Sequence, residues 1–197
     1  MEDQLNTCPK KTSLIVISGP SGVGKATISQ ALLKANPEIK LSLSATTRKA
    51  RKGEMDGLDY YFISKEQFLE KIKKNQFLEW AMVHGNYYGT PLEAVNSQLV
   101  SSHVLLEIDI QGGCRVKELF GKRCITFFIL PPSFDELLHR LNKRGSETPS
   151  EIERRLETAR LELLRQDEYD YTIINDDIDR AVNQILMILK GRLCIEE

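Results

Sequence analysis

The sequence predicts an α/β fold in which a parallel P-loop sheet core carries helices on both faces. Two observations support this prediction. Four short apolar runs, at residues 14–17, 104–110, 124–130 and 171–174, resemble buried strands, and each is followed by a helical pattern. Continuous apolar strands are typical of parallel sheets covered on both sides. Such sheets bind their ligands at the carboxyl ends of the strands.

The length and composition indicate one globular domain. The chain has 197 residues, of which 41% are hydrophobic and 28% charged. A domain of this size buries about 70% of its surface on folding, so its stability requires neither disulfides nor a structural metal. Its 27 basic and 28 acidic residues give a net charge of −1, which excludes a broad basic groove for nucleic acid. We therefore expect small-molecule partners and no nucleic-acid partner; the sequence leaves the oligomeric state open.

The cysteines and the apolar runs predict a cytoplasmic protein without a membrane segment. The four cysteines have neither C-x-x-C nor zinc-site spacing, so we expect reduced thiols; they are Cys8, Cys114, Cys124 and Cys194. The N-terminal segment begins acidic, and the apolar run at 14–17 is too short for a signal peptide. No run is long enough to span a bilayer.

Two amphipathic helices are predicted in the C-terminal half. Apolar residues recur at helical spacing over residues 134–141 and 178–189. Between them, Pro149 suits the first position of another helix, with Thr148 as its N-cap and Glu151 closing a capping box. Gly145 then lies in a hinge between two arginine-bearing helices.

Residues 41–92 differ from the rest of the chain in the pattern of their apolar and aromatic residues. This stretch begins with alternating apolar and polar residues and continues with aromatic-rich runs separated by short turns. We expect a small β-rich insert between the first and second strands of the main sheet.

A glycine-rich turn after the first strand predicts a phosphate-binding loop. Its glycines allow backbone N–H groups and a helix N-terminus to converge on phosphate, and Lys25 adds a charge for the outer phosphates. The alternative is a glycine turn with a surface lysine. The usual Ser or Thr after the lysine is Ala26 here, which weakens the expectation of a side-chain metal ligand. The residues of this segment predicted to bind a nucleoside triphosphate, the site that the resemblance described below assigns to ATP, are Gly19, Pro20, Ser21, Gly22, Val23, Gly24, Lys25, Ala26 and Thr27.

Several motifs in the insert, together with this loop, resemble the guanylate kinase family of nucleoside monophosphate kinases. They are residues 44–51, 53–54, 59–62, 77–81 and 85–90, and the resemblance extends from about residue 14 to 189. It implies transfer of the terminal phosphoryl group of ATP to GMP, and to dGMP as well, with Mg²⁺ as cofactor. It also implies a single domain with a core at about 12–40, 92–135 and 168–193, a GMP-binding insert at about 41–91 and a lid at about 136–167.

The predicted GMP site combines cations, hydroxyls and carboxylates. Arg48 and Arg51 can fork onto one phosphate, with the hydroxyls of Tyr60 and Tyr88 as neutral donors, although a solvated surface pair of arginines is the alternative. The resemblance assigns guanine recognition to Glu79, which could otherwise be a surface charge at a strand edge. It adds Ser44, Thr90 and Asp109 to the same site.

The remaining candidates lie near the donor phosphates. Glu107 and Asp109, two apart on one strand, would hold Mg²⁺ through water and contact the acceptor, unless they only cap the following helix. The resemblance places lid arginines over the phosphates and Asn175 near the adenine, whereas composition alone suggests surface ion pairs for the arginines. The predicted catalytic residues are Lys25, Arg48, Arg140, Arg144 and Arg155.

Two other functions remain open at this point. The same fold serves as a non-catalytic peptide-binding module in scaffold proteins, and related kinases act on other monophosphates or phosphorylated sugars. The P-loop argues against the module, and Glu79 with Ser44 argues for guanine. His84, His103 and His139 lack triad or metal spacing, so we expect structural roles for them.

Overall fold

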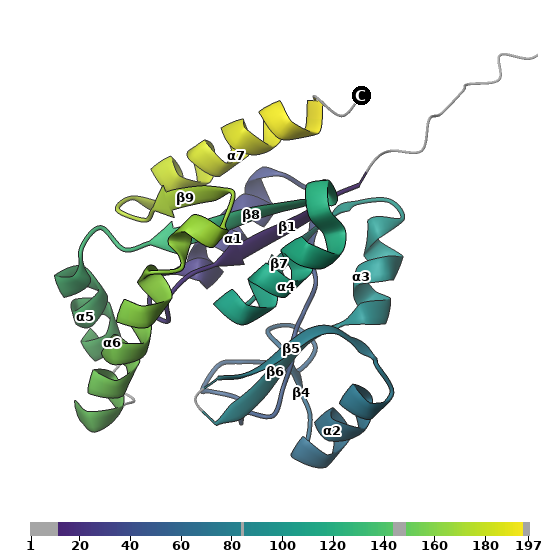
Figure 1. The fold of residues 1–197 in the computed structure, drawn as a ribbon, viewed down its shortest axis with the longest axis horizontal. Coiled ribbons are helices and arrows are strands. Elements are labelled where there is room, and N and C mark those ends of the chain that lie inside the picture. The colour runs from purple at the N-terminus through teal and green to yellow at the C-terminus, as the bar shows by residue number, and fades with distance from the viewer. Residues whose placement is uncertain (1–11, 84, 144–148, 195–197) are drawn as a thin grey trace, which may run out of the picture.

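The main sheet has five parallel strands in the order β2-β7-β1-β8-β9, in a computed structural model that describes residues 12–83, 85–143 and 149–194 (Figure 1). The strands are β1 (Leu14–Ser18), β2 (Ile39–Leu41), β7 (His103–Glu107), β8 (Cys124–Leu130) and β9 (Tyr171–Ile174). Leu14 on the central strand pairs with Val104 on one side and Cys124 on the other. The predicted α/β fold is confirmed.

Helices cover both faces of this sheet because consecutive residues of β1 point to opposite sides. Ile15 and Ile17 face a core shared with α1 (Lys25–Ala35) and α7 (Ile178–Cys194). Leu14 and Val16 face a second core, shared with α3 (Leu92–Leu99) and α4 (Ile110–Phe120). All four of these β1 side chains are fully buried, as a central parallel strand requires.

A second, smaller sheet lies below the first in Figure 1, in the order β4-β3-β6-β5. Its strands are β3 (Ala45–Thr46), β4 (Tyr61–Phe62), β5 (Phe77–Val83) and β6 (Asn86–Pro91). Helix α2 (Lys65–Lys73) packs Phe68 against the rings of Phe77 and Tyr87. Ser64 and Gln67 form a capping box at the start of α2. The sequence analysis expected only strands and turns in this aromatic-rich stretch and did not predict the helix.

Helices α5 (Phe134–Lys143) and α6 (Pro149–Leu163) lie together beside the carboxyl ends of β1 and β8. Leu137 and Leu141 of α5 pack with Ala159 of α6 in a small separate core. Pro149 is the first residue of α6, as predicted, whereas the expected cap at Thr148 and hinge at Gly145 lie outside the described residues. Two short 3₁₀ helices, Gly121–Arg123 and Gln166–Glu168, complete the chain.

Two sequence predictions about strands were wrong. The run expected to continue to residue 110 ends as a strand at Glu107, and Asp109 instead caps α4, its side chain accepting a hydrogen bond from the Gly112 N–H at 2.9 Å. The insert does not directly follow the first strand, because Ile39–Leu41 pairs with β7 and adds an edge strand to the main sheet. Of these three residues only Ile39 is buried, so the hydrophobic pattern is too short to predict a strand from the sequence.

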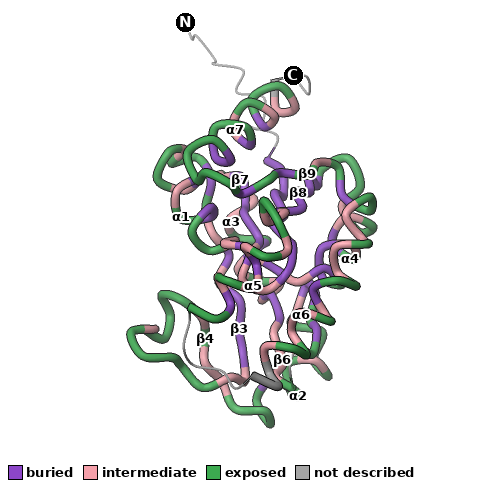
Figure 2. The backbone as a smooth tube through the Cα atoms, turned by 90° about the vertical axis from the view of Figure 1, so that its left-hand side faces the viewer, coloured by how far each residue is buried: buried purple, intermediate pink, exposed green. Residues whose placement is uncertain are grey.

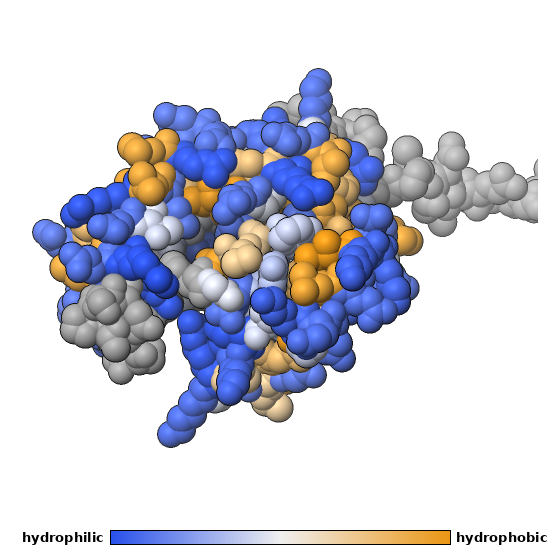
Figure 3. Space-filling view, turned by 60° about the horizontal axis from the view of Figure 1, so that its bottom comes forward, coloured by the Kyte–Doolittle hydropathy of each residue, from blue (hydrophilic) through white to orange (hydrophobic). Residues whose placement is uncertain are grey.

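Burial is concentrated in the main sheet, whereas the insert and the outer helix faces are more exposed (Figure 2). The face shown in Figure 3 is largely hydrophilic, with hydrophobic side chains in small separate patches. No helix in the described part of the chain is both long and apolar enough to cross a bilayer.

Candidate active site

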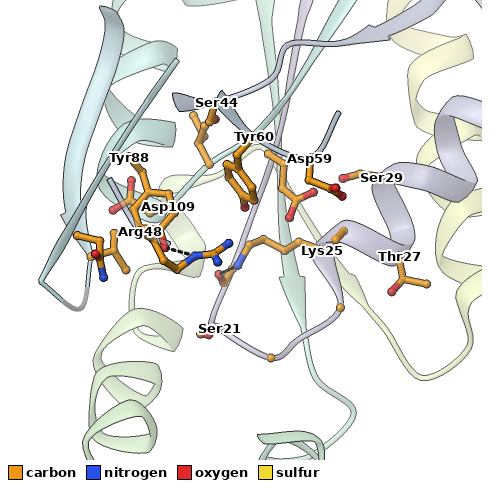
Figure 4. Close-up of a pocket in the computed structure, with 18 of the residues that line it drawn as sticks. Ser21, Lys25, Thr27, Ser29, Ser44, Arg48, Asp59, Tyr60, Tyr88 and Asp109 are labelled. Atoms are coloured by element: carbon orange, nitrogen blue, oxygen red, sulfur yellow. Dashed lines mark hydrogen bonds between the residues drawn. The ribbon is translucent and has the colours of Figure 1, made fainter. Parts of the chain in front are cut away.

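One cleft of about 560 Å³ is bounded by the carboxyl edge of the main sheet, the insert and α6. A cleft of this size suits small-molecule ligands. Figure 4 shows Lys25 extending from the start of α1, with Arg48, Tyr60 and Tyr88 of the insert side of the cleft drawn around it. The predicted site residues that line the cleft are Gly19, Ser21, Gly22, Gly24, Lys25, Ala26, Thr27, Ser44, Arg48, Arg51, Tyr60, Glu79, Tyr88, Glu107, Asp109 and Arg155.

The loop between β1 and α1 has the backbone that phosphate binding needs. Gly24 has φ 100° and directly precedes α1, and a Cβ at this position would lie 2.5 Å from Nδ2 of Asn175. Glycine is required here because an L side chain would be both strained and blocked. Lys25 folds back along the loop and donates to the carbonyls of Gly19 at 2.6 Å and Pro20 at 3.1 Å.

Two predicted residues, Asn175 and Arg140, hold this loop through hydrogen bonds and are not among the residues that line the cleft. Nδ2 of buried Asn175 donates to the carbonyl of Val23 at 2.7 Å. Arg140 donates to the same carbonyl at 3.2 Å, to the carbonyl of Asn175 at 3.1 Å, and to Glu136 at 2.8 Å. These bonds fix the loop against β9 and α5, and direct nucleotide contacts by Arg140 or Asn175 stay predictions.

Helix α6 contacts the same loop through a side chain. Nη1 of Arg155 lies 3.4 Å from Oγ of Ser21, which places this arginine beside the loop. Arg144 lies outside the described residues. The carboxylate of Glu162, which sequence reasoning missed, also lines the cleft.

Arg48 is held in place on the opposite side of the cleft by a carboxylate that the sequence analysis gave no role. Its guanidinium makes a two-point contact with Glu54 at 2.8 and 2.9 Å and donates to the hydroxyl of Tyr88 at 3.2 Å. The hydrogen bonds to Arg48 hold the pKa of Glu54 below its usual value. Glu54 also accepts a hydrogen bond from the Arg51 backbone N–H at 2.6 Å. Its position three residues after Arg51 was the feature of the sequence that could have indicated its role.

Glu79 is buried at the floor of the insert, so it is not a surface charge at a strand edge. Only 3% of it is exposed, and its Oε1 accepts from the hydroxyl of Thr90 at 2.6 Å and from the Thr90 N–H at 3.1 Å. Its other oxygen lies against Gly112 of α4, where there is no room for a Cβ. Burial raises the pKa of Glu79 to about 7, and the nearby Asp109 contributes.

Glu107, at the end of β7, and Asp109, at the N-cap of α4, both line the cleft. Burial raises the pKa of both carboxyls, and the positive charge of Lys25 opposes the rise. Ala26 and Thr27 lie exposed on the first turn of α1. No group of three or more His, Cys, Asp or Glu side chains in the described ranges is arranged to hold a metal by itself.

Comparison with known proteins decides the family. The family model described as guanylate kinase matches residues 11–192. The chain belongs to the guanylate kinase family. It is 50% identical over 182 residues to guanylate kinase from Desulfitobacterium hafniense (strain Y51), covering 92% of this chain and 90% of the relative. A crystal structure of guanylate kinase from Anaplasma phagocytophilum has a TM-score of 0.77 and 34% identity, covering 93% of this chain and 87% of that chain.

The guanylate kinase from Caldanaerobacter subterraneus subsp. tengcongensis is also 50% identical, over 186 residues that cover 94% of this chain and 90% of the relative. Relatives of nearly equal length therefore span the P-loop, the insert and α6 together. The guanylate kinase resemblance seen in the sequence is confirmed, and it extends across both halves of the cleft.

Proposed function

We propose that this chain is an ATP:GMP phosphotransferase that transfers the terminal phosphoryl group of ATP to GMP, giving ADP and GDP, and that it also accepts dGMP. The observation that supports this most directly is a buried carboxylate, Glu79, in the same cleft as a P-loop carrying Lys25. A P-loop alone would fit any nucleoside triphosphate. The carboxylate adds selection for a base that offers hydrogen-bond donors.

ATP binds at the P-loop in this proposal. The backbone N–H groups of residues 19–27 and the N-terminus of α1 surround the phosphates, and Lys25 exchanges its carbonyl contacts for the outer phosphates. Asn175 and Arg140 hold Val23, so they act first by positioning the loop. The side-chain amide of Asn175 is buried and bonded to Val23, so its predicted contact with adenine would be made by the backbone at and next to residue 175.

GMP binds in the insert. Glu79 accepts from N1 and N2 of guanine, and adenine would leave this carboxylate unpaired. Ser44 and Asp109 line the same cleft, and Thr90 acts on the base through its hydrogen bonds to Glu79. Arg48, Arg51, Tyr60 and Tyr88 receive the phosphate of GMP, which replaces Glu54 as the two-point partner of Arg48.

Catalysis then consists of positioning and charge stabilisation. The acceptor is a phosphate with a second pKa of about 6, so its attacking oxygen is already anionic and no general base is needed. Lys25, Arg48 and Arg155, with Arg140 and Arg144 as further lid cations, stabilise charge on the transferred group. Glu107 and Asp109 are suited to hold Mg²⁺ through water, and bound Mg²⁺ would neutralise charge on the ATP phosphates.

The proposed organisation assigns these roles to parts of one cytoplasmic domain. The core spans about 12–40, 92–135 and 168–193, the GMP-binding insert about 41–91 and the lid about 136–167. The second sheet and the α5–α6 pair support this division, because each packs its own small cluster of side chains.

A nucleotide panel tests the proposal. ADP formation is measured with ATP and, in turn, GMP, dGMP, AMP, UMP and dTMP, each with and without Mg²⁺. We expect turnover with GMP and dGMP and a preference over AMP of at least about 10², the scale set by unpaired buried polar groups. Equal rates with AMP and GMP would refute guanine recognition, and no turnover with any acceptor would support a binding module.

A further inference from the structure

Helix α1 carries a buried hydroxyl in the cleft that the proposed function leaves without a role. Ser29 is 1% exposed, lines the cleft, and is drawn in Figure 4 with its side chain directed into it. Its Oγ forms no hydrogen bond with any residue that the structure describes. Most buried polar side-chain atoms have a partner, because an unpaired one gives up its bonds to water without replacement. A hydroxyl in this position is suited to a bond with something that the cleft binds.

The surroundings of Ser29 combine a cation with an acid. Lys25 precedes it by four residues, so both side chains lie on one face of α1. Glu107, at the end of β7, lines the same cleft. Burial raises the pKa of Glu107, and Lys25 and the Ser29 hydroxyl favour its ionised form, although Ser29 is not placed to form a hydrogen bond with it. A loop cation, a carboxyl group and an unpaired hydroxyl therefore face the same cleft.

Helix α1 lacks a hydroxyl where this type of loop usually has one. The Ser or Thr directly after a P-loop lysine is the side chain that ligates Mg²⁺, and here that residue is Ala26. Thr27 comes one residue later and is therefore rotated by about 100° around the helix. Ser29 comes three residues after Ala26, which returns it to the same face of α1, one turn farther along. Ser29 is thus the next hydroxyl on the face where the usual ligand is missing.

The spacing along the helix fits a contact through water. One turn of helix rises about 5.4 Å. A magnesium–oxygen contact and a hydrogen bond between two oxygens together span about 4.8 Å. Side chains of a helix also tilt toward its N-terminus, which in α1 is the end at the phosphate-binding loop. Because Mg²⁺ gives up its waters reluctantly, a hydroxyl at this distance is suited to a water of the ion and not to the ion itself.

We propose that Ser29 is a positioning residue for the magnesium ion of bound ATP, in place of the hydroxyl that Ala26 lacks. Its Oγ accepts a hydrogen bond from a water on the ion and donates its own hydrogen to the carboxylate of Glu107. The hydroxyl thereby gains the partners that the protein alone does not give it. This inference rests on the proposed function only in requiring that ATP binds this loop together with Mg²⁺.

The test measures by calorimetry how much Mg²⁺ tightens ATP binding. The full chain, without GMP, is titrated with ATP in EDTA and again at saturating Mg²⁺. The ratio of the two Kd values reports the affinity of the ion for the bound nucleotide, since the affinity of free ATP for Mg²⁺ is common to all variants. The variants are Ser29→Ala and the double variant Ala26→Ser/Ser29→Ala.

Ser42→Ala is the matched control. Ser42 is 3% exposed, and its Oγ also has no partner among the described residues, but it is not one of the residues that line the cleft. Both single variants therefore remove a buried, unpaired hydroxyl, and only one of them removes it from the cleft. Thermal unfolding of each unliganded variant checks that it folds.

We expect Ser29→Ala to reduce the effect of Mg²⁺ on Kd by about tenfold or more, the loss typical of groups that hold a metal's ligands in place. Its Kd for ATP in EDTA, and both Kd values of Ser42→Ala, should stay within about twofold of the parent. The double variant regains a hydroxyl at the usual position, so the effect of Mg²⁺ should return to within about threefold of the parent. Neither serine hydroxyl has a partner to lose, so the Tm of both unliganded single variants should be unchanged or higher.

Three results would overturn the inference and leave the proposed function in place. They are an unchanged effect of Mg²⁺ in Ser29→Ala, an equal loss of ATP affinity with and without Mg²⁺, and a loss in Ser42→Ala as large as that in Ser29→Ala. The second would mean that the hydroxyl supports the loop, and the third that it acts through packing.

The parent protein separates this inference from the function on which it rests. Absence of ATP binding by the parent, or an ATP affinity that Mg²⁺ does not change, would count against the proposed function as well. Should Ser29→Ala fail to fold, Ser29→Cys decides the question with the same titrations, because a thiol is of similar size and only a weak acceptor.

Discussion

Replacing Glu79 by Gln should remove guanine recognition while leaving the cleft intact. The residue is 3% exposed and its Oε1 already accepts two bonds from Thr90, so we expect Oε2, which lies against Gly112, to be the oxygen left for the base. An amide NH₂ at this position meets guanine donors with another donor. Each buried unsatisfied group costs about 1–3 kcal/mol, and two such groups cost about 2–6 kcal/mol. Since about 1.4 kcal/mol is tenfold, kcat/KM for GMP should fall by about 30-fold to about 10⁴-fold.

The assay compares parent and Glu79→Gln with GMP and AMP at saturating ATP, and measures ATP binding separately. ATP affinity should change little, because Glu79 lies in the insert and the P-loop lies across the cleft. The control is Glu157→Gln, which removes an exposed carboxylate from α6. Turnover of GMP at the parental rate by Glu79→Gln would refute the assignment. If ATP binding were weakened as much as GMP turnover, the substitution would have disrupted the whole cleft.

Further variants test the cations, the metal and the buried acid. Arg155→Ala should lower kcat by about 10²–10⁴ with little change in Tm, because the lost cation meets transition-state charge, whereas exposed charges contribute about 0–1 kcal/mol to stability; a large fall in Tm with kcat intact would indicate a structural role. Lys25→Ala should lower kcat by about 10³ or more, whereas Ala26→Ser should change it less than about tenfold; a hundredfold gain in Ala26→Ser during a Mg²⁺ titration would mean that the parent is impaired. The pKa of Glu79 rises from 4.5 in the unfolded chain to about 7 in the folded protein. Burial of the ionised carboxylate therefore does not lower the free energy of unfolding below pH 4.5, and it lowers it by the full amount above pH 7. As pH rises from about 5 to 8, the free energy of unfolding of the parent should therefore fall relative to Glu79→Gln by up to about 3 kcal/mol in urea titrations, and parallel curves would refute a raised pKa.

The sequence predicted those parts of the fold in which local pattern and tertiary burial agree. The runs in β1 and β8 are almost entirely apolar and buried, and they became strands at those positions. The run in β9 also became a strand, although only Ile173 in it is buried. The run after residue 104 was misleading because Ile108 and Ile110 remain buried after the strand has ended, the first in the link to α4 and the second in α4 itself. Hydrophobicity records burial, and it does not by itself distinguish a strand from the turn that follows.

Site residues were predictable when a motif fixes their chemistry and were missed when a distant partner does. Lys25 and its glycines follow from local spacing. Glu162 was missed because nothing in its own helix marks it, and the loop residues with which it lines the cleft, such as Ser21 and Lys25, are far away in the sequence. Asp109 is an intermediate case. It caps α4 by accepting a hydrogen bond from the Gly112 N–H, and it also lines the cleft, so a capping role and a role in ligand binding do not exclude each other.

The bond between Asn175 and Val23 has a consequence for how the protein matures during synthesis. These residues are 152 positions apart, and the amide that steadies the phosphate loop is attached to the end of the last strand. An N-terminal fragment ending after β8 would contain the whole glycine-rich motif yet lack the groups that fix its carbonyl. The glycine-rich loop of a growing chain therefore lacks the Asn175 amide that holds the Val23 carbonyl until β9 and the residue after it have been added.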